Sequence, residues 1–466
     1  MLRIDRNRRW STQLGFAAVA ALLALPLQGC DTGVLGVNDP DIVLDANSPA
    51  AARALRNGVF LRLSQAVNGI QGPDALFVFT GLLTDEYRSG DTFVQRNNQD
   101  QRIFQPDNTF NAGPNRSLNR IRTEAERAIV AFRRYLPDST SALASMFAMT
   151  AYAEVLMGEF YCNGTPLSGI VGTTIVFGDP LTNDSVLSLA VSHADSALAQ
   201  LALSPTFDSV AVRRWDRLAR IVKARALLDR GQFAAAAATV PASAVPTTYK
   251  FYAHHSLTST TNQVWALNNS ARRYTLTSGA EGGVGIDFVT ANDRRLPRRI
   301  GGASVFDNSV PMTLVRQAIY GQFDSIPIAS GIEARLIEAE ALLRIGDNPN
   351  WLIAINALRT NTALYPAIGT GLTAGVTLGA NLTALADSGA RNVDVHFRER
   401  AFWMFSTGHR LGDMRRLLRQ YGRTEAQVYP NGAYVKGGSY GDALQMPVPF
   451  DETNNPNFTQ CLDRNP

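Results

Sequence analysis

Two stretches of the chain share one pattern: Ala219-Arg-Ile-Val-Lys-Ala-Arg-Ala-Leu-Leu-Asp-Arg-Gly231-Gln-Phe-Ala and Arg335-Leu-Ile-Glu-Ala-Glu-Ala-Leu-Leu-Arg-Ile-Gly346-Asp. Each is an Ala- and Leu-rich segment that ends at a glycine, after which a second apolar segment begins at once. Small Ala side chains let two helices approach closely, and a glycine can turn the chain between them. The pattern is typical of tetratricopeptide (TPR) helix pairs.

A third candidate pair contains Gly158, in Glu154-Val-Leu-Met-Gly158-Glu-Phe. The three glycines are 73 and 115 residues apart, so the chain is not a tandem array with the 34-residue TPR period. We therefore expect the helix pairs to pack together from separated parts of the chain.

Apolar side chains at helical spacing continue on both sides of these pairs. Ser48-Pro49 opens the first helix, as an N-cap and a first-turn proline, and Gly69 ends it. The spacing predicts further helices over residues 74–83, 115–135, 139–158, 184–203, 213–230, 232–240, 331–345, 350–360, 392–404 and 407–418.

The helical spacing fails in two regions, residues 241–325 and the last fifty residues. A polar stretch at 87–113 also lacks it. Irregular segments this long in a compact chain are usually functional. The sequence thus predicts an all-α fold in which TPR-like helix pairs form a scaffold and a large, irregular, loop-rich half binds a ligand.

The first thirty residues have the features of a targeting segment. Arg3, Arg6, Arg8 and Arg9 precede an apolar run, 14–25, that is too short to span a bilayer. The run leads to Leu27-Gln28-Gly29-Cys30, the pattern of a bacterial lipobox, in which the cysteine receives a diacylglycerol. We predict a signal peptide at 1–29 and a lipid anchor at Cys30.

The mature chain divides by pattern into three parts. A polar, lipid-anchored tether is predicted at 30–48, an N-terminal TPR-like helical part at 49–240, and a C-terminal part at 241–466. The whole chain has 44 Lys and Arg against 40 Asp and Glu, but the signal peptide holds four Arg and one Asp of these. The mature charge is therefore close to zero, which gives no reason to expect a nucleic-acid partner.

Two cysteines remain in the mature chain, Cys162 and Cys461. An even pair in an exported protein is typical of a disulfide rather than of a metal site. Cys162 follows a predicted helix and Cys461 lies in a tail that no predicted helix holds. We therefore predict a disulfide that ties the C-terminus to the N-terminal half.

Three segments near the C-terminus, taken in order with the lipobox, the Ser48-Pro49 helix and the Ala-rich pairs, resemble the SusD/RagB family of outer-membrane nutrient-binding lipoproteins. They are Phe397-Arg-Glu399-Arg400-Ala-Phe-Trp403, Gly408-His-Arg410-Leu-Gly-Asp413-Met-Arg-Arg416 and Pro447-Val-Pro449-Phe-Asp-Glu452-Thr-Asn-Asn-Pro456. The resemblance covers essentially the whole mature chain. The sequence departs from it at Thr407, where the family often carries Glu, and after Cys30, where an acidic run for surface export is not obvious.

The resemblance implies a function as well as a fold. It implies a nutrient-binding lipoprotein of the outer membrane that delivers a ligand, in most relatives a glycan, to a TonB-dependent SusC-like transporter. No cofactor is expected. A second reading, a TPR-type protein-interaction adaptor, would need a concave helical groove but not the long excursion at 241–325.

Catalytic and metal sites are disfavoured by spacing. Gly437-Gly-Ser439-Tyr-Gly441 matches a nucleophile-elbow pattern, but no histidine follows His409 to complete a triad. The five histidines lack metal-ligand spacing. Charged residues around Glu399, Arg400 and Asp413 are better explained by a structural ion-pair network.

Aromatic residues of the irregular segments are the candidate ligand contacts. Sugar rings stack their apolar C–H faces on aromatic planes, while polar and charged side chains bond the hydroxyls. Each such aromatic can instead be a plug that fixes its loop to the body. The candidate ligand-binding residues are Trp265, Tyr274, Tyr252, Arg273 and Phe288.

Overall fold

The computed structural model describes residues 47–69, 74–171, 174–207, 209–277 and 281–466. Residues 46–466 form one compact unit, which is described by itself. The predicted signal peptide, Cys30 and all of the tether but its last two residues lie outside the described residues.

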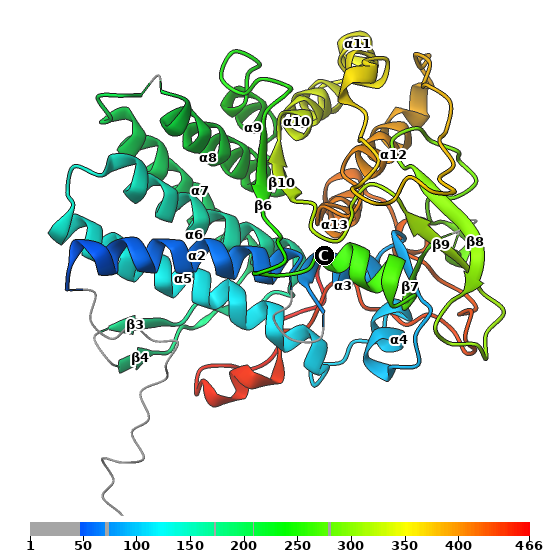
Figure 1. The fold of residues 1–466 in the computed structure, drawn as a ribbon, viewed down its shortest axis with the longest axis horizontal. Coiled ribbons are helices and arrows are strands. Elements are labelled where there is room, and N and C mark those ends of the chain that lie inside the picture. The colour runs from blue at the N-terminus through cyan, green and yellow to red at the C-terminus, as the bar shows by residue number, and fades with distance from the viewer. Residues whose placement is uncertain (1–46, 70–73, 172–173, 208, 278–280) are drawn as a thin grey trace, which may run out of the picture. The chain divides into compact units, whose positions relative to one another are not determined.

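Helices are the main regular structure of this unit (Figure 1). They are α2 (Pro49–Val67), α3 (Leu76–Leu83), α4 (Val94–Asp100), α5 (Thr109–Tyr135), α6 (Thr140–Phe160), α7 (Asn183–Ala202), α8 (Val210–Asp229), α9 (Phe233–Thr239), α10 (Gly331–Arg344), α11 (Asn348–Arg359), α12 (Asn392–Trp403), α13 (Arg410–Tyr421) and α14 (Glu425–Val428). The predicted all-α fold class is confirmed.

Side-chain caps set where several helices begin. The Ser48 hydroxyl accepts a hydrogen bond from the Ala51 N–H (3.1 Å) at α2, and the Ser330 hydroxyl accepts one from the Glu333 N–H (3.1 Å) at α10. Most starts lie within three residues of the prediction, and the largest shift is at α5, which begins at Thr109 rather than 115 because the Asn108 side chain caps it there. α4 also forms inside the polar stretch 87–113.

Two of the three glycines behave as predicted, whereas Gly158 lies inside α6 and does not turn the chain. Gly231 (φ +73°) and Gly346 (φ +79°) adopt the left-handed conformation between α8 and α9 and between α10 and α11. At Gly158, a Cβ would lie 2.8 Å from Leu187 Cγ, so only glycine permits this approach of α6 to α7. α10 packs against both α8 and α9 (Figure 1), which confirms that pairs from separated parts of the chain come together.

The described residues of the region predicted to be irregular, 241–325, form short strands, a π-helical turn (Trp265–Ser270) and a 3₁₀ turn (Glu281–Gly283), and no α-helix. The strands contribute to five two-stranded antiparallel sheets: β1 (Tyr87–Ser89) with β7 (Tyr274–Leu276), β6 (Lys250–Ala253) with β10 (Ile326–Ser330), β2 (Thr165–Pro166) with β5 (Pro180–Leu181), β3 (Gly169–Val171) with β4 (Thr174–Val176), and β8 (Arg298–Ser304) with β9 (Thr313–Gln317). The β1–β7 pair joins the polar stretch 87–113 to the excursion 241–325.

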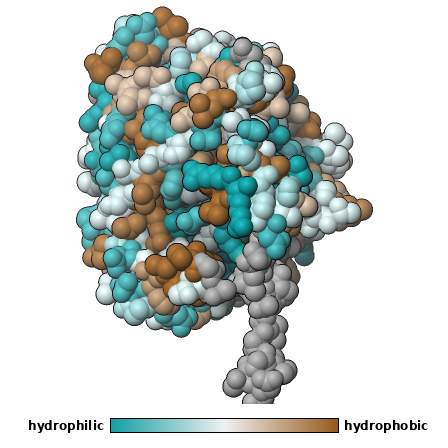
Figure 2. Space-filling model, turned by 90° about the vertical axis from the view of Figure 1, so that its left-hand side faces the viewer, coloured by the Kyte–Doolittle hydropathy of each residue, from teal (hydrophilic) through white to brown (hydrophobic). Residues whose placement is uncertain are grey.

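α6 is a core helix. Its composition would suit a membrane span, but 83% of its apolar window is buried inside the unit, against α5, α7 and α8. Figure 2 shows the face of the helices at the left of Figure 1, where polar and apolar residues are interspersed. The continuous apolar surface therefore lies inside, and the outer helices present a mixed surface.

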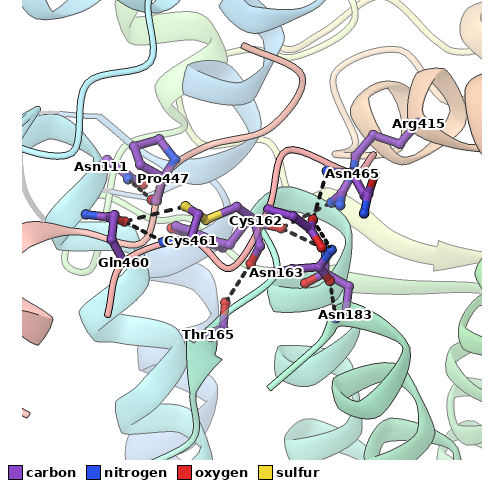
Figure 3. The surroundings of a disulfide bond; sticks show 12 residues. Asn111, Cys162, Asn163, Thr165, Asn183, Arg415, Pro447, Gln460, Cys461 and Asn465 are labelled. Atoms are coloured by element: carbon purple, nitrogen blue, oxygen red, sulfur yellow. Dashed lines mark hydrogen bonds between the residues drawn. A yellow bond between two sulfur atoms is a disulfide. The ribbon is translucent and has the colours of Figure 1, made fainter. Parts of the chain in front are cut away.

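The predicted disulfide between Cys162 and Cys461 is present, with their Cα atoms 5.6 Å apart (Figure 3). Backbone hydrogen bonds on both sides fix the two segments: the Leu462 N–H donates to the Asn163 carbonyl (2.8 Å), and the Cys162 N–H donates to the Met446 carbonyl (3.0 Å). The tail after α14 is thereby attached to the end of α6.

Replacing both cysteines by serine should lower the free energy of unfolding by about 2–4 kcal/mol, because the bridge closes a long loop and restricts the unfolded chain. Chemical denaturation of the wild-type protein and of Cys162→Ser/Cys461→Ser under oxidising conditions measures this. Equal stability of the two proteins would show that the bridge contributes nothing.

Candidate functional site

Four separate segments meet where β1 and β7 end. They are the turn 89–93, residues 271–274, the β8–β9 connection 304–309, and the loop 434–440. Backbone hydrogen bonds tie them together: the Gly90 N–H donates to the Arg273 carbonyl (2.8 Å) and the Asp307 N–H donates to the Gly90 carbonyl (2.8 Å). A Cβ at Gly90 would lie 2.5 Å from Val305 Cβ, so the close approach requires glycine.

Arg273 is the centre of this arrangement, which we call the loop site (Asp91, Phe93, Arg273, Phe306 and Lys436). Its guanidinium lies 4.0 Å from the ring centroid of Phe306 and 4.8 Å from that of Phe93, and it bonds the buried carboxylate of Asp91. The Lys436 ammonium donates to the Asp91 carbonyl and lies 3.0 Å from an Asp307 carboxylate oxygen. Each charge is held in place by a neighbour.

The two rings of the loop site remain open to solvent. Phe93 is 45% exposed and Phe306 is 38% exposed. Single exposed apolar side chains are common at protein surfaces, but two aromatic rings held by one guanidinium form a small patch. A guanidinium that fixes two exposed rings provides apolar platforms beside hydrogen-bonding groups, and this combination suits a sugar.

The hairpin of β8 and β9 encloses an open hollow of about 710 Å³ next to Phe306 in the chain. Its lining residues are Gly301, Gly302, Ala303, Ser304, Asn308, Val310, Pro311, Met312 and Thr313.

Two of the predicted ligand-binding residues, Tyr274 and Phe288, are plugs. Tyr274 is fully buried, its hydroxyl donates to the Asp74 carboxylate, and its ring lies 5.9 Å from that of Tyr87. Phe288 is fully buried against Phe402 and Phe405, at 5.2 and 5.1 Å between ring centroids. A side chain without exposed surface cannot stack on a ligand, so neither is retained as a platform.

The other predicted ligand contacts are placed differently. Arg273 lies in the loop site. Trp265 is half-buried at the start of the π-helical turn Trp265–Ser270 and keeps exposed surface, so it remains a predicted platform. Tyr252 is half-buried on β6 and lines a separate cavity.

Phe93 and Phe306 were not predicted as ligand contacts. Both lie in the irregular segments, next to polar dipeptides: Asp91-Thr92 precedes the first and Asp307-Asn308 follows the second. Trp265 and Tyr274 have polar neighbours of the same kind, Asn262-Gln263 and Arg272-Arg273. Polar neighbours therefore indicate candidate aromatics, but they do not separate a platform from a plug.

The charged C-terminal motif forms a buried ion-pair network, as predicted. Arg400 Nε lies 3.0 and 2.9 Å from the two Asp413 carboxylate oxygens, and Arg416 Nη2 lies 2.7 Å from one of them. Glu399 pairs with Arg295 at 2.6 Å. All five side chains are buried, which makes them structural rather than an acid–base site open to substrate.

Ser439 lies in a turn-rich loop bridged to Ala433, and its carbonyl accepts a hydrogen bond from Gln101 (2.8 Å). A nucleophile elbow needs a strand before the serine and a helix after it. The structure gives Ser439 neither, so the Gly-x-Ser-x-Gly pattern is a turn. Within the described part of the chain, no three His, Cys, Asp or Glu side chains gather as a metal would require.

The fold consists of stacked TPR-like helix pairs joined to a loop-rich half with exposed aromatic rings. Comparison with known proteins finds the same kind of fold. No family model matches the sequence, and no curated protein matches it. Solved structures do match, at low sequence identity.

Three of them cover most of the chain. A SusD-like carbohydrate-binding protein from Bacteroides fragilis has a TM-score of 0.63 at 12% identity, over 89% of this chain and 99% of that one. A SusD superfamily protein from Bacteroides vulgatus gives 0.61 at 12% identity, over 89% and 98%. A SusD/RagB family protein from Bacteroides thetaiotaomicron gives 0.59 at 16% identity, over 87% and 94%. The predicted resemblance is confirmed: this chain has the fold of SusD-like carbohydrate-binding proteins.

Proposed function

We propose that the protein is a nutrient-binding lipoprotein that captures a glycan at the loop site and delivers it to a TonB-dependent SusC-like transporter. The observation that carries the proposal is the pair of exposed rings, Phe93 and Phe306, fixed by the guanidinium of Arg273. Stacking on the rings supplies apolar contact, and Arg273 and Lys436 supply donors for hydroxyl groups. The SusD-like fold supports the same function.

The charge distribution of the loop site favours binding over catalysis. Asp91 has an exposed side-chain fraction of 0% and is fully engaged by Arg273 and Arg96. Such a carboxylate cannot reach a ligand to exchange a proton. The alternative function, a protein-interaction adaptor, does not require two exposed aromatic rings held by one guanidinium.

The ligand class is tested by titrating the mature lipoprotein, in mild detergent, with a panel of oligosaccharides and a panel of peptides. We expect saturable binding of an oligosaccharide. Phe306→Ala should weaken it by about 1–3 kcal/mol, the size of a lost aromatic anchor. Binding of peptides alone, or unchanged affinity in the variant, would contradict the proposal.

We place the protein at the outer membrane, held by a lipid on Cys30. From the lipidated cysteine, the tether 30–48 leads to Pro49, where α2 begins. The only described helix with the composition of a membrane span is α6, and it is buried. The lipid is therefore the proposed attachment.

Cys30→Ser should move the protein from the membrane to the soluble fraction or leave it unprocessed, because the acyl chains supply the membrane affinity. Fractionation of cells followed by a carbonate wash, which strips peripheral proteins, measures this. A variant that stays with the washed membranes as the wild type does would rule out the anchor.

A further inference from the structure

A second cavity, of about 540 Å³, lies between β6, the end of β10, the segment 364–370 and the end of α12. We call it the β6 cavity. Lys250, Tyr252 and His254 line one wall, since alternate residues of an extended strand point to the same side. None of the five loop-site residues lines it.

Two aromatic side chains of the β6 cavity keep part of their surface exposed. Tyr252 and Trp403 are only half-buried, although Phe402 and Phe405 beside Trp403 are fully in the core. The Trp403 ring lies 5.1 Å from the Arg295 guanidinium and 6.0 Å from the Tyr365 ring, and neither of these two residues lines the cavity. The cavity therefore offers fixed aromatic planes to a small ring-shaped ligand.

One cation at the β6 cavity lacks a counter-ion. The chain has three lysines. Lys223 pairs with Asp195 (2.6 Å) and Lys436 with Asp307 (3.0 Å), whereas Lys250 has no carboxylate partner among the described residues. Lys250 is an exposed residue of β6, and partial burial lowers the pKa of its ammonium with no carboxylate to offset that effect. An anion on a ligand would supply the missing partner.

The other ionisable groups of the β6 cavity do not neutralise this cation. Asp324 Oδ2 accepts hydrogen bonds from the backbone N–H groups of Gly321 and Thr370, both at 2.8 Å. His254 bonds the Ser325 hydroxyl (3.0 Å), and burial together with the charge of Arg214 lowers its pKa, which keeps it neutral at pH 7. Among the described residues, Lys250 is thus the cation of the β6 cavity without an ion-pair partner.

We propose that the β6 cavity is a second ligand site, which takes a sugar acid with its ring against Tyr252 and Trp403 and its carboxylate at Lys250. The apolar face of the sugar ring covers the aromatic planes. Its hydroxyls reach Ser325 and His254. The proposal does not rest on the function proposed for the loop site, because the two sites share no residue.

The experiment compares D-glucuronate with D-glucose, which differ in the carboxylate, by calorimetric titration of the mature lipoprotein. We expect glucuronate to bind about tenfold more tightly, the change expected from one charge-assisted hydrogen bond. Lys250→Gln should abolish the difference and Tyr252→Ala should weaken both sugars. Lys223→Gln, at a paired lysine, should change nothing. Equal binding of the two sugars, or a Lys250→Gln variant like the wild type, would overturn the proposal.

Two further measurements locate the ligand. Glucuronate should protect Lys250, but not Lys223, from a limiting amine-acylating reagent read out by peptide mass spectrometry. The loop-site variant Phe93→Ala/Phe306→Ala should bind glucuronate as the wild type does, even if its glycan binding is lost. Loss of glucuronate binding in that variant alone would place the sugar acid in the loop site and overturn the proposal.

Discussion

Tyr274→Ala is expected to lower the free energy of unfolding by about 3–5 kcal/mol, because it removes a large, fully buried ring and leaves a cavity. The ring lies beside Tyr87 and Arg96, and its hydroxyl donates a hydrogen bond to the Asp74 carboxylate. Urea denaturation of the wild type and the variant measures the change. The folded fraction of Tyr274→Ala should bind the glycan with the affinity of the wild type.

Tyr274→Phe separates the ring from the hydroxyl. It keeps the packing and removes one hydrogen bond to a buried carboxylate, a loss of about 1–3 kcal/mol. If Tyr274→Ala lost glycan affinity with its stability unchanged, Tyr274 would be a ligand platform, as the sequence first suggested, and its placement as a plug would be wrong.

Asp413→Asn is expected to lower the free energy of unfolding by a similar amount, about 3–5 kcal/mol. The substitution keeps the shape of the side chain but removes one buried carboxylate from Arg400 and Arg416, which then share only Glu340 and, for Arg416, Asp229. Asp394→Asn is the matched control, since Asp394 pairs with Arg423 (2.7 Å) at the surface, where an ion pair contributes about 0–1 kcal/mol. Similar losses in the two variants would show that burial of the network is not what makes it strong.

The same network predicts a dependence on pH. Burial raises the pKa of Asp413, but Arg400 and Arg416 lower it by more, to about 2 against an ordinary value of 3.8. Because the folded-state pKa lies below the unfolded one, the contribution of Asp413 is complete above about pH 4 and is lost as the pH falls through 2. The unfolding free energy of Asp413→Asn should therefore fall less steeply than that of the wild type over this range.

Local rules were enough to predict the scaffold. Apolar side chains at helical spacing, hydroxyl caps such as Ser48 and turning glycines such as Gly231 and Gly346 act within a few residues of themselves, so they can be read from the sequence. The disulfide could also be predicted from the sequence, because only two cysteines follow Cys30.

Local rules could not tell which aromatic residues of the irregular half are buried plugs and which are exposed platforms for a ligand. Whether Tyr274 is a plug or a platform depends on Asp74 and Arg96, about 200 residues away in the chain, which meet it only in the folded protein. Likewise, Phe93 and Phe306 form one site because Gly90 lets the segment around Val305 approach. Sequence periodicity carries no signal for such long-range contacts.

The central claim is that exposed rings of the loop site bind the glycan. The most direct measurement is the affinity of Phe93→Ala/Phe306→Ala for the tightest-binding oligosaccharide, with Phe177→Ala, which removes a ring that is 41% exposed next to β4, as the control. We expect the double variant to lose about 1–3 kcal/mol of binding for each ring removed, with an unchanged unfolding midpoint, and the control to bind like the wild type. Wild-type affinity in the double variant would contradict the account.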